Sequence, residues 1–324
     1  MRYILESNRH YRNHRVTLLA GGVGGARMAR ALRPVIDPGS LTVVVNVGDD
    51  TERYGVYVSA DPDTVLYTLA GVEGPNGWGR IGDTTTVMEQ LSGLGIDTSF
   101  SLGDSDLGLC LARTIMLSEG QSLSQVMTRF AKTFGLDDVS LLPVTDDRLE
   151  THVQITGGRW LAFQEYFVDR RHVDRVEALA FHGSVDATPA PGVIEAIDKA
   201  DTLVVAPSNP PLSIWPILSI DEVADAVRRH PHRVAVSPLF GGAPLKGPAD
   251  AVMAGVGLSG GTRGILEAYR DMIDHLFIDD QDRDDVALGD EFGVGVYATN
   301  TRMTTDGDGD GEKLALQILG LAEQ

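Results

Sequence analysis

The chain has 324 residues, 43% of them hydrophobic, which is enough for one large α/β domain or two smaller ones with a substantial core. Its 46 Asp and Glu against 27 Lys and Arg give a net charge of −19, which opposes binding to nucleic acid and to anionic membrane surfaces. Cys110 is the single cysteine, so an internal disulfide and a CxxC metal site are excluded, and no stretch approaches the roughly 20 apolar residues that span a bilayer. We expect a globular, cytoplasmic protein.

Residues 1–15 are expected to form a polar N-terminal extension. They include Arg2, Arg9, Arg12 and Arg15 and lack the apolar core of a signal peptide. Residues 16–324 are predicted to form the globular domain.

The first strand, predicted over 16–20, runs into a glycine-rich turn. Gly21, Gly22, Gly24 and Gly25 follow it, and a helical pattern then begins. Backbone without Cβ can approach a ligand closely, and the N–H groups of a helix N-terminus favour an anion, most often phosphate. The spacing matches neither the full Rossmann fingerprint nor a Walker A loop, so a turn that serves only helix–strand packing is the alternative.

Two acidic groups come next along the chain. The β-branched run 41–47 ends in Gly48-Asp49-Asp50, at the carboxyl end of a predicted strand, where open α/β sheets bind ligands. Asp61-Pro-Asp63-Thr64 then precedes a helical pattern over 65–70, and the alternative is that Asp63 or Thr64 only caps that helix. Four carboxylates beside a phosphate site would repel an anion unless a hard cation lay between them, and oxygen ligands suit Mg²⁺. We therefore predict a magnesium site on Asp49, Asp50 and Asp63.

The middle of the chain is predicted to leave the sheet as a helical and hairpin insertion over about 78–170. Residues 103–117 begin with capping carboxylates and continue as an amphipathic helix, and a second helix follows Ser122. Alternating residues over 151–156, a Gly157-Gly158 turn and the run 160–168 predict a β-hairpin.

Sheet-like segments return after residue 200. The buried run 200–206 ends in Pro-Ser208-Asn209-Pro-Pro, where the Asn side chain suits a nucleobase edge or a phosphate, with a structural Asx turn as the alternative. The run 233–237 leads to a glycine pair and then Lys246, which suits phosphate or is a solvated surface charge. Residues 306–312 imitate an EF-hand loop, but Gln317 stands where a bidentate Glu belongs, so a solvated turn before a last helix over 313–321 is expected.

Strand-like runs alternate with helical patterns along the whole chain. This alternation of strands and helices predicts a doubly wound α/β fold with a mostly parallel, Rossmann-like sheet.

Eight short segments, taken together, form a recognisable pattern. Their order and approximate spacing resemble those of the 2-phospho-L-lactate transferase family of coenzyme F420 biosynthesis, and the resemblance covers nearly the whole chain from Val16. The segments are Ala20-Gly-Gly-Val-Gly-Gly-Ala26, Asn46-Val-Gly-Asp-Asp50, Asp61-Pro-Asp-Thr-Val-Leu-Tyr67, Gly77-Trp-Gly79, Leu102-Gly-Asp104, Phe163-Gln-Glu165, Ala206-Pro-Ser-Asn-Pro210 and Lys246-Gly-Pro-Ala249.

The resemblance implies a transfer between two substrates. Enzymes of this family move a phospho-acid from its guanylylated, GDP-type donor to the terminal hydroxyl of the deazaflavin Fo, with release of GMP and formation of F420-0 or its dehydro form. The acid is 2-phospholactate, phosphoenolpyruvate or 3-phosphoglycerate, and the resemblance suggests a homodimer.

The same resemblance assigns site residues. It implies that Asp63 contacts Fo, and that the glycine turn and the Ser208-Asn209 loop hold the guanosine phosphates and base. The expected ligand-binding residues are Gly21, Gly22, Gly24, Gly25, Asn46, Asp63, Thr64, Ser208, Asn209 and Lys246.

Attack of an alcohol on a diphosphate needs charge neutralised on the phosphoryl oxygens and a group that orients the hydroxyl. We expect Mg²⁺ on Asp49, Asp50 or Asp63 to do the first and one of these carboxylates, the predicted catalytic residues, to do the second. Lys246 and Arg27 are candidate supplementary cations.

Three positions depart from the family pattern. Ser105 stands where relatives often carry Arg, Cys110 where they carry His, and Trp215 where many carry Gly, which bears on the identity of the phospho-acid. The alternatives to the transferase are a nucleotidyltransferase, an NAD-dependent enzyme, and a non-catalytic nucleotide-binding or nucleotide-sensing protein. A Gly-Asp-Asp turn argues against the dehydrogenase, which needs a lone ribose-binding carboxylate there.

Overall fold

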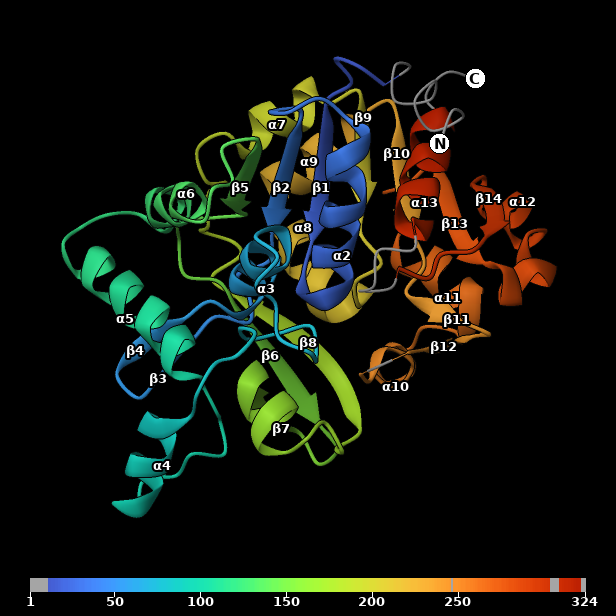
Figure 1. The fold of residues 1–324 in the computed structure, drawn as a ribbon. Helices are drawn as coiled ribbons and strands as arrows, with labels where there is room; N and C mark the ends of the chain where they lie inside the picture. The colour runs from blue at the N-terminus through green and yellow to red at the C-terminus, as the bar shows by residue number, and fades with distance from the viewer. Residues whose placement is uncertain (1–10, 246, 304–308, 322–324) are drawn as a thin grey trace.

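The structure is a computed structural model, and it describes residues 11–245, 247–303 and 309–321. Its centre is one seven-stranded sheet in the order β14-β13-β10-β9-β1-β2-β5, with every neighbouring pair parallel (Figure 1). The predicted doubly wound α/β fold is therefore confirmed, and this sheet is parallel throughout. Its strands are β1 (Val16–Ala20), β2 (Leu41–Val45), β5 (Val139–Pro143), β9 (Thr202–Val205), β10 (Arg233–Val236), β13 (His275–Asp279) and β14 (Gly295–Thr299).

The strand order reverses at β1. The chain first builds outward through β2 and β5, then returns to the other side of β1 and continues through β9 and β10. Strands β1 and β9 are buried along their whole length, as expected of apolar strands covered on both faces. Ligands of such sheets bind outside the carboxyl ends at the reversal, which here means the residues that follow β1, β2 and β9.

Helices cover both faces of the central sheet. The layer formed by α2, α3 and α13 lies on one face, and α7, α8 and α9 lie on the other (Figure 1). The bounds of these helices are α2 Gly22–Leu32, α3 Ala60–Leu69, α7 Val193–Lys199, α8 Trp215–Leu218, α9 Asp221–Arg229 and α13 Asp310–Gly320. A short 3-10 helix, Arg33–Val35, follows α2. The smaller elements of the C-terminal half are α10 (Ala249–Gly255), α11 (Gly261–Ala268), α12 (Leu288–Phe292), the 3-10 helix Asp280–Asp285, and the strands β11 (Leu239–Phe240) and β12 (Ala243–Pro244), which pair with each other.

The expected insertion is two separate excursions, because β5 of the central sheet divides it. The first carries the helices α4 (Thr86–Gly93), α5 (Asp104–Ser118) and α6 (Leu123–Thr133); the hairpin of β3 (Thr51–Arg53) and β4 (Val56–Val58) precedes it in the chain, before α3. The second is an antiparallel sheet of β6 (Glu150–Ile155), β7 (Arg159–Ala162) and β8 (Val176–His182), which lies below the carboxyl ends of the central strands (Figure 1).

The predicted hairpin is confirmed over β6 and β7 but wrong beyond residue 162. Residues Glu165–Asp169 form a π-helical turn instead of extending the second strand. Phe163 and Tyr166 are buried in one small apolar cluster, and the Phe163 and Phe167 rings stack at 5.2 Å. Phe163 and Tyr166, three residues apart, would lie on opposite faces of a strand, whereas a helical turn brings residues three and four apart to one side.

Helices α4 and α5 cap each other. Asp83, before α4, accepts the N–H groups of Ser105 at 2.8 Å and Asp106 at 3.1 Å, while Asp104 of α5 accepts those of Thr86 and Val87 at the start of α4. The expectation that α5 is capped by its own carboxylates is therefore wrong. The second helix predicted after Ser122 is confirmed as α6, and Ser122 begins it with a full capping box.

The end of the polar extension is tied to the domain. Tyr11 is buried, and the N–H of Arg15 donates to Asp201 at 2.8 Å. Residues 1–10 and 304–308, with the start of the EF-hand-like run, lie outside the described residues; the last helix begins at Asp310 and not at Lys313. Among the helices that the structure describes, none combines the length and apolar character needed to cross a membrane.

Candidate functional site

The glycine turn is itself the first turn of α2. Gly21 is the N-cap, and Gly22 opens the helix with a φ of +57°. A Cβ on Gly24 would lie 2.0 Å from the Pro207 carbonyl oxygen, and one on Gly25 would lie 2.7 Å from the Ala20 Cβ. Packing alone therefore requires glycine at positions 24 and 25, which is the alternative raised from the sequence.

Two loops predicted to share a ligand do meet. Ser208 Oγ donates to the Gly21 carbonyl at 2.6 Å and lies 3.3 Å from the Gly21 N–H. Asn209 instead caps the π-helical turn Pro210–Ile214, because its Oδ1 accepts the N–H of Leu212 at 3.3 Å. The Asx role that the sequence left open for Asn209 is thus present in the structure.

Asn46 and Asp61 join the glycine turn to the end of β2. The Asn46 side chain is fully buried; its Nδ2 donates to Asp61 Oδ2 at 3.0 Å and its Oδ1 accepts the Gly48 N–H at 2.8 Å. The backbone of Gly22 also hydrogen-bonds to the Asp61 carboxylate. Asp61, absent from the predicted site residues, therefore occupies one of the helix N-terminal groups that the sequence assigned to phosphate.

The Gly-Asp-Asp turn is held from both sides. The β6 residue Thr151 donates its N–H to the Gly48 carbonyl at 2.8 Å, and Gln164 Nε2 donates to the Asp49 carbonyl at 2.8 Å. On the other side, Asp50 Oδ2 accepts the Tyr57 hydroxyl at 2.9 Å and the Ser59 hydroxyl at 2.7 Å.

One oxygen of each carboxylate in this turn is left over. Asp49 Oδ1 and Asp50 Oδ1 are buried, and no hydrogen-bond donor among the described residues reaches either of them. Burial raises the pKa of Asp50 to about 8; burial, with the charge of Asp61, raises the pKa of Asp49 well above its usual value. Buried carboxylate oxygens without donors are costly unless a proton or a cation meets them, so these two fit a hard divalent ion.

Asp63 and Thr64 lie inside α3, not at its cap. The helix begins at Ala60 with Ser59 in the cap position, and Thr64 Oγ1 donates to the Ala60 carbonyl at 2.8 Å. The capping alternative is therefore wrong for both residues. Asp63 instead forms an ion pair with Arg113 of α5; burial raises the pKa of Asp63 to about 6, against the lowering effect of that guanidinium.

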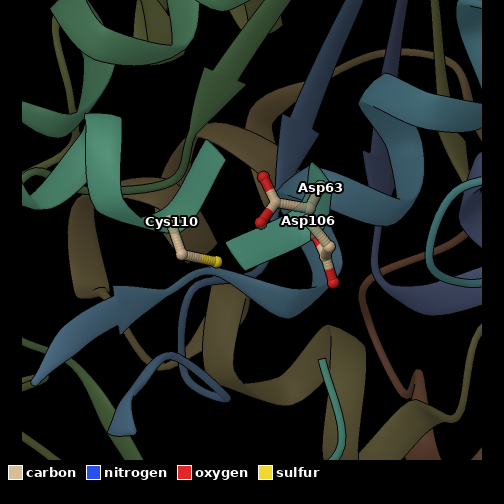
Figure 2. A group of neighbouring side chains, drawn as sticks. All are labelled: Asp63, Asp106 and Cys110. Carbon is tan, nitrogen blue, oxygen red and sulfur yellow. The ribbon is translucent and has the colours of Figure 1, made fainter. Parts of the chain in front are cut away.

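The structure does not gather Asp49, Asp50 and Asp63 into one compact ligand set. Among the described residues, the one group of three with ligand atoms within 4.8 Å of one another is Asp63, Asp106 and Cys110, whose side chains point toward each other across α3 and α5 (Figure 2). The Arg113 guanidinium is already placed there, 3.9 Å from the Cys110 sulfur. Burial raises the pKa of the Cys110 thiol to about 12, so a neutral thiol beside a fixed cation makes this group a poor metal site.

The other predicted side chains are the two supplementary cations and the three positions that differ from the family pattern. Arg27 Nη1 donates to the Met303 carbonyl at 3.3 Å, and Lys246 lies outside the described residues. Cys110 packs in an apolar cluster under β4, whereas Ser105 is exposed at the start of α5. Trp215 Nε1 donates to the Ala268 carbonyl at 3.0 Å, which ties it to α11.

Comparisons with known proteins confirm the expected family. The sequence over residues 16–312 matches the family described as 2-phospho-L-lactate transferase CofD. The chain is 41% identical over 318 residues to a phosphoenolpyruvate transferase of Kitasatospora aureofaciens, covering 96% of this chain and 98% of that protein. It is 38% identical over 317 residues to a 2-phospho-L-lactate transferase of Methanopyrus kandleri, covering 96% of this chain and 99% of that protein.

A solved structure shares the fold. A Bacillus halodurans protein of the UPF0052 family aligns with a TM-score of 0.64 over 94% of this chain and 99% of its own, at 16% identity. The family match and the two relatives carry the assignment beyond the fold: this chain is a transferase that belongs to the 2-phospho-L-lactate transferase family.

Proposed function

We propose that this transferase moves a three-carbon phospho-acid from its guanylylated donor to the terminal hydroxyl of Fo, with release of GMP. The observation that carries the proposal is the pair of donor-free buried oxygens on Asp49 and Asp50, beside the glycine turn and at the point where the strand order reverses. The two relatives, a phosphoenolpyruvate transferase and a 2-phospho-L-lactate transferase, support a phospho-acid of the phosphoenolpyruvate or 2-phospholactate kind.

Different parts of the site would bind the donor and orient the acceptor. The backbone of the glycine turn and the Ser208 loop would bind the phosphates of the donor, since both lie at the carboxyl ends of β1 and β9. Asp63, held by Arg113 on the neighbouring helix, would accept a hydrogen bond from the attacking hydroxyl and orient it. No covalent intermediate with the protein is needed.

Mg²⁺ would be held by Asp49 and Asp50. When bound there, it would offset the negative charge of the phosphoryl oxygens. The hydroxyls of Tyr57 and Ser59 both donate to Oδ2 of Asp50 and so fix that carboxylate with Oδ1 left for the ion. A homodimer, a cytoplasmic location and a ligand role for Lys246 and Asn209 stay predictions.

The decisive assay combines the purified protein with Fo, GTP, Mg²⁺, the partner guanylyltransferase and one phospho-acid at a time, and identifies products by mass. We expect one Fo adduct, formed with phospholactate, phosphoenolpyruvate or 3-phosphoglycerate, and one GMP for each adduct. Tight guanine-nucleotide binding without an adduct from any acid would favour the nucleotide sensor. Turnover that needed NAD and released no GMP would favour the dehydrogenase.

A further inference from the structure

A fully buried arginine lies beneath the acidic site. Arg113 of α5 has no exposed surface, and it pairs through Nη2 with Asp63 and donates through Nη1 to the Tyr57 carbonyl at 3.1 Å. Its guanidinium also stands 5.5 Å from the centre of the Phe130 ring. An arginine stays protonated under all ordinary conditions, so this position holds a permanent positive charge.

The charge of Arg113 acts on two carboxylates of the site. It lowers the pKa of Asp63 and that of Asp50, in both cases against the larger opposing effect of burial. Tyr57 joins the same network from both ends, because its hydroxyl donates to Asp50 while its carbonyl accepts from Arg113. The guanidinium is therefore a fixed counter-charge for Asp63 and Asp50.

This arrangement divides the carboxylates into two kinds. Asp63 already has a cation on its Oδ1, and a divalent ion placed against the same carboxylate would face the repulsion of Arg113 at short range. Asp49 and Asp50 each keep a buried Oδ1 that no described donor reaches. The cation-binding side and the arginine-held side are thus different parts of one site.

We propose that Arg113 is a positioning residue that holds Asp63 outside the coordination shell of the metal and aims it at the acceptor hydroxyl, while Asp49 and Asp50 alone supply the protein's carboxylate ligands. The inference rests on the proposed function for the role of Asp63, and its metal-binding part is measured without any substrate. It narrows the sequence-based prediction, which placed Asp63 among the magnesium ligands.

The first test measures Mn²⁺ binding to the metal-free protein by electron paramagnetic resonance. We expect Asp49→Asn and Asp50→Asn each to weaken Mn²⁺ binding by about tenfold or more, because each removes a charged ligand. Asp63→Asn should change the affinity by less than about threefold. A loss with Asp63→Asn as large as that with Asp49→Asn would overturn the proposal.

The second test replaces the arginine. Arg113→Met frees the Asp63 carboxylate, so Mn²⁺ should bind at least about threefold more tightly or at a second site, and the double variant with Asp63→Asn should reverse that gain. The kcat should fall by about 30-fold or more with a nearly unchanged KM for the donor, and Arg113→Lys should restore much of it. Unchanged Mn²⁺ affinity and kcat, with only a lower Tm, would reduce Arg113 to a structural residue.

Arg33 provides a matched control. It also bridges an aspartate and a backbone carbonyl, Asp138 and Leu69, but at the C-terminal end of α3, whereas the site lies at the N-terminal end of that helix. Arg33→Met should leave Mn²⁺ binding and kcat unchanged. If Arg113→Met does not fold, Asp63→Asn still decides the metal assignment, and Arg113→Lys with its kcat decides the positioning role. A wild-type protein that binds Mn²⁺ as expected and yields no Fo adduct would contradict the proposed function and leave the metal assignment standing.

Discussion

The glycine side and the acidic side of the site satisfy their polar groups in different ways. On the glycine side, Ser208 is bonded to the Gly21 backbone and Gly24 packs directly against the Pro207 carbonyl. On the acidic side, Asp49 is just as buried and Asp50 is half-buried, yet each keeps a buried oxygen that no donor among the described residues reaches. Because an unmet buried carboxylate costs stability, the acidic side is the part of the site expected to gain from a ligand.

The largest effect should follow from a change on the acidic side. Asp50→Asn preserves the size of the side chain and removes its charge, so kcat/KM for Fo should fall by about 10³-fold or more. Steady-state kinetics at saturating Mg²⁺ measure this. Asp198→Asn, an exposed carboxylate on α7 that pairs with Arg229, should leave the rate unchanged. More than a tenth of wild-type turnover in Asp50→Asn would remove Asp50 from the machinery.

A change on the glycine side should act on stability first. The Cβ of Gly24→Ala would lie 2.0 Å from the Pro207 oxygen, and we expect the free energy of unfolding to drop by about 1–3 kcal/mol. Gly108→Ala, in an open position on α5, should instead raise it by about 0.5–1 kcal/mol. Urea unfolding compares the two. A Gly24→Ala protein of full stability that no longer bound guanine nucleotide would restore a direct ligand role to that glycine.

Ser208 should give a smaller change of the same kind. Ser208→Ala leaves the Gly21 N–H and carbonyl without their shared partner, which should cost about 1–2 kcal/mol of unfolding free energy. Thermal unfolding measures the loss, and Ser118→Ala on an exposed helix end should be within about 0.5 kcal/mol of wild type. Equal effects of the two serine variants would mean that the two loops are held together by other contacts.

Sequence patterns located most of the framework. Apolar β-branched runs marked the central strands, and the rule that ligands bind at carboxyl ends placed Asp49, Asp50 and Ser208 on one edge of the sheet. Local spacing failed at residues 163–169, where a run of aromatic residues suits a strand and a helix equally well until the small core to be filled is known.

Contacts between residues far apart in the chain could not be predicted from any local sequence pattern. Arg113 pairs with Asp63 from 50 positions away, and Asp61 of α3 accepts a hydrogen bond from the backbone of Gly22 in α2. One signal was present for the arginine: Asp106, Cys110 and Arg113 lie four and three residues apart, so a cation stands on the inward stripe of α5. A charge at such a position needs a buried partner, which the sequence does not name.

A pH dependence separates the acidic side from the rest of the molecule. The folded pKa of Asp50 lies at about 8, above the ordinary 3.8, because burial disfavours the charge. The metal-free folded state therefore binds more protons than the unfolded state between these values, and stability should fall as pH rises from about 4 to about 8. The side chain that Asp50→Asn introduces cannot ionise, so the unfolding free energy of this variant should rise relative to that of the wild type as pH rises.

Mg²⁺ should act in the opposite direction on the wild type. An ion on Asp49 and Asp50 favours their charged form, so added Mg²⁺ should raise stability most at the upper end of this pH range and do little for Asp50→Asn. Urea unfolding in EDTA and in Mg²⁺, at several pH values, measures both differences. Exposed pairs such as Arg283 and Asp280 contribute equally to both proteins and cancel in the comparison. Parallel pH profiles for the two proteins in EDTA would mean that the pKa of Asp50 is not raised by folding, and an equal response of both proteins to Mg²⁺ would place the ion away from Asp50.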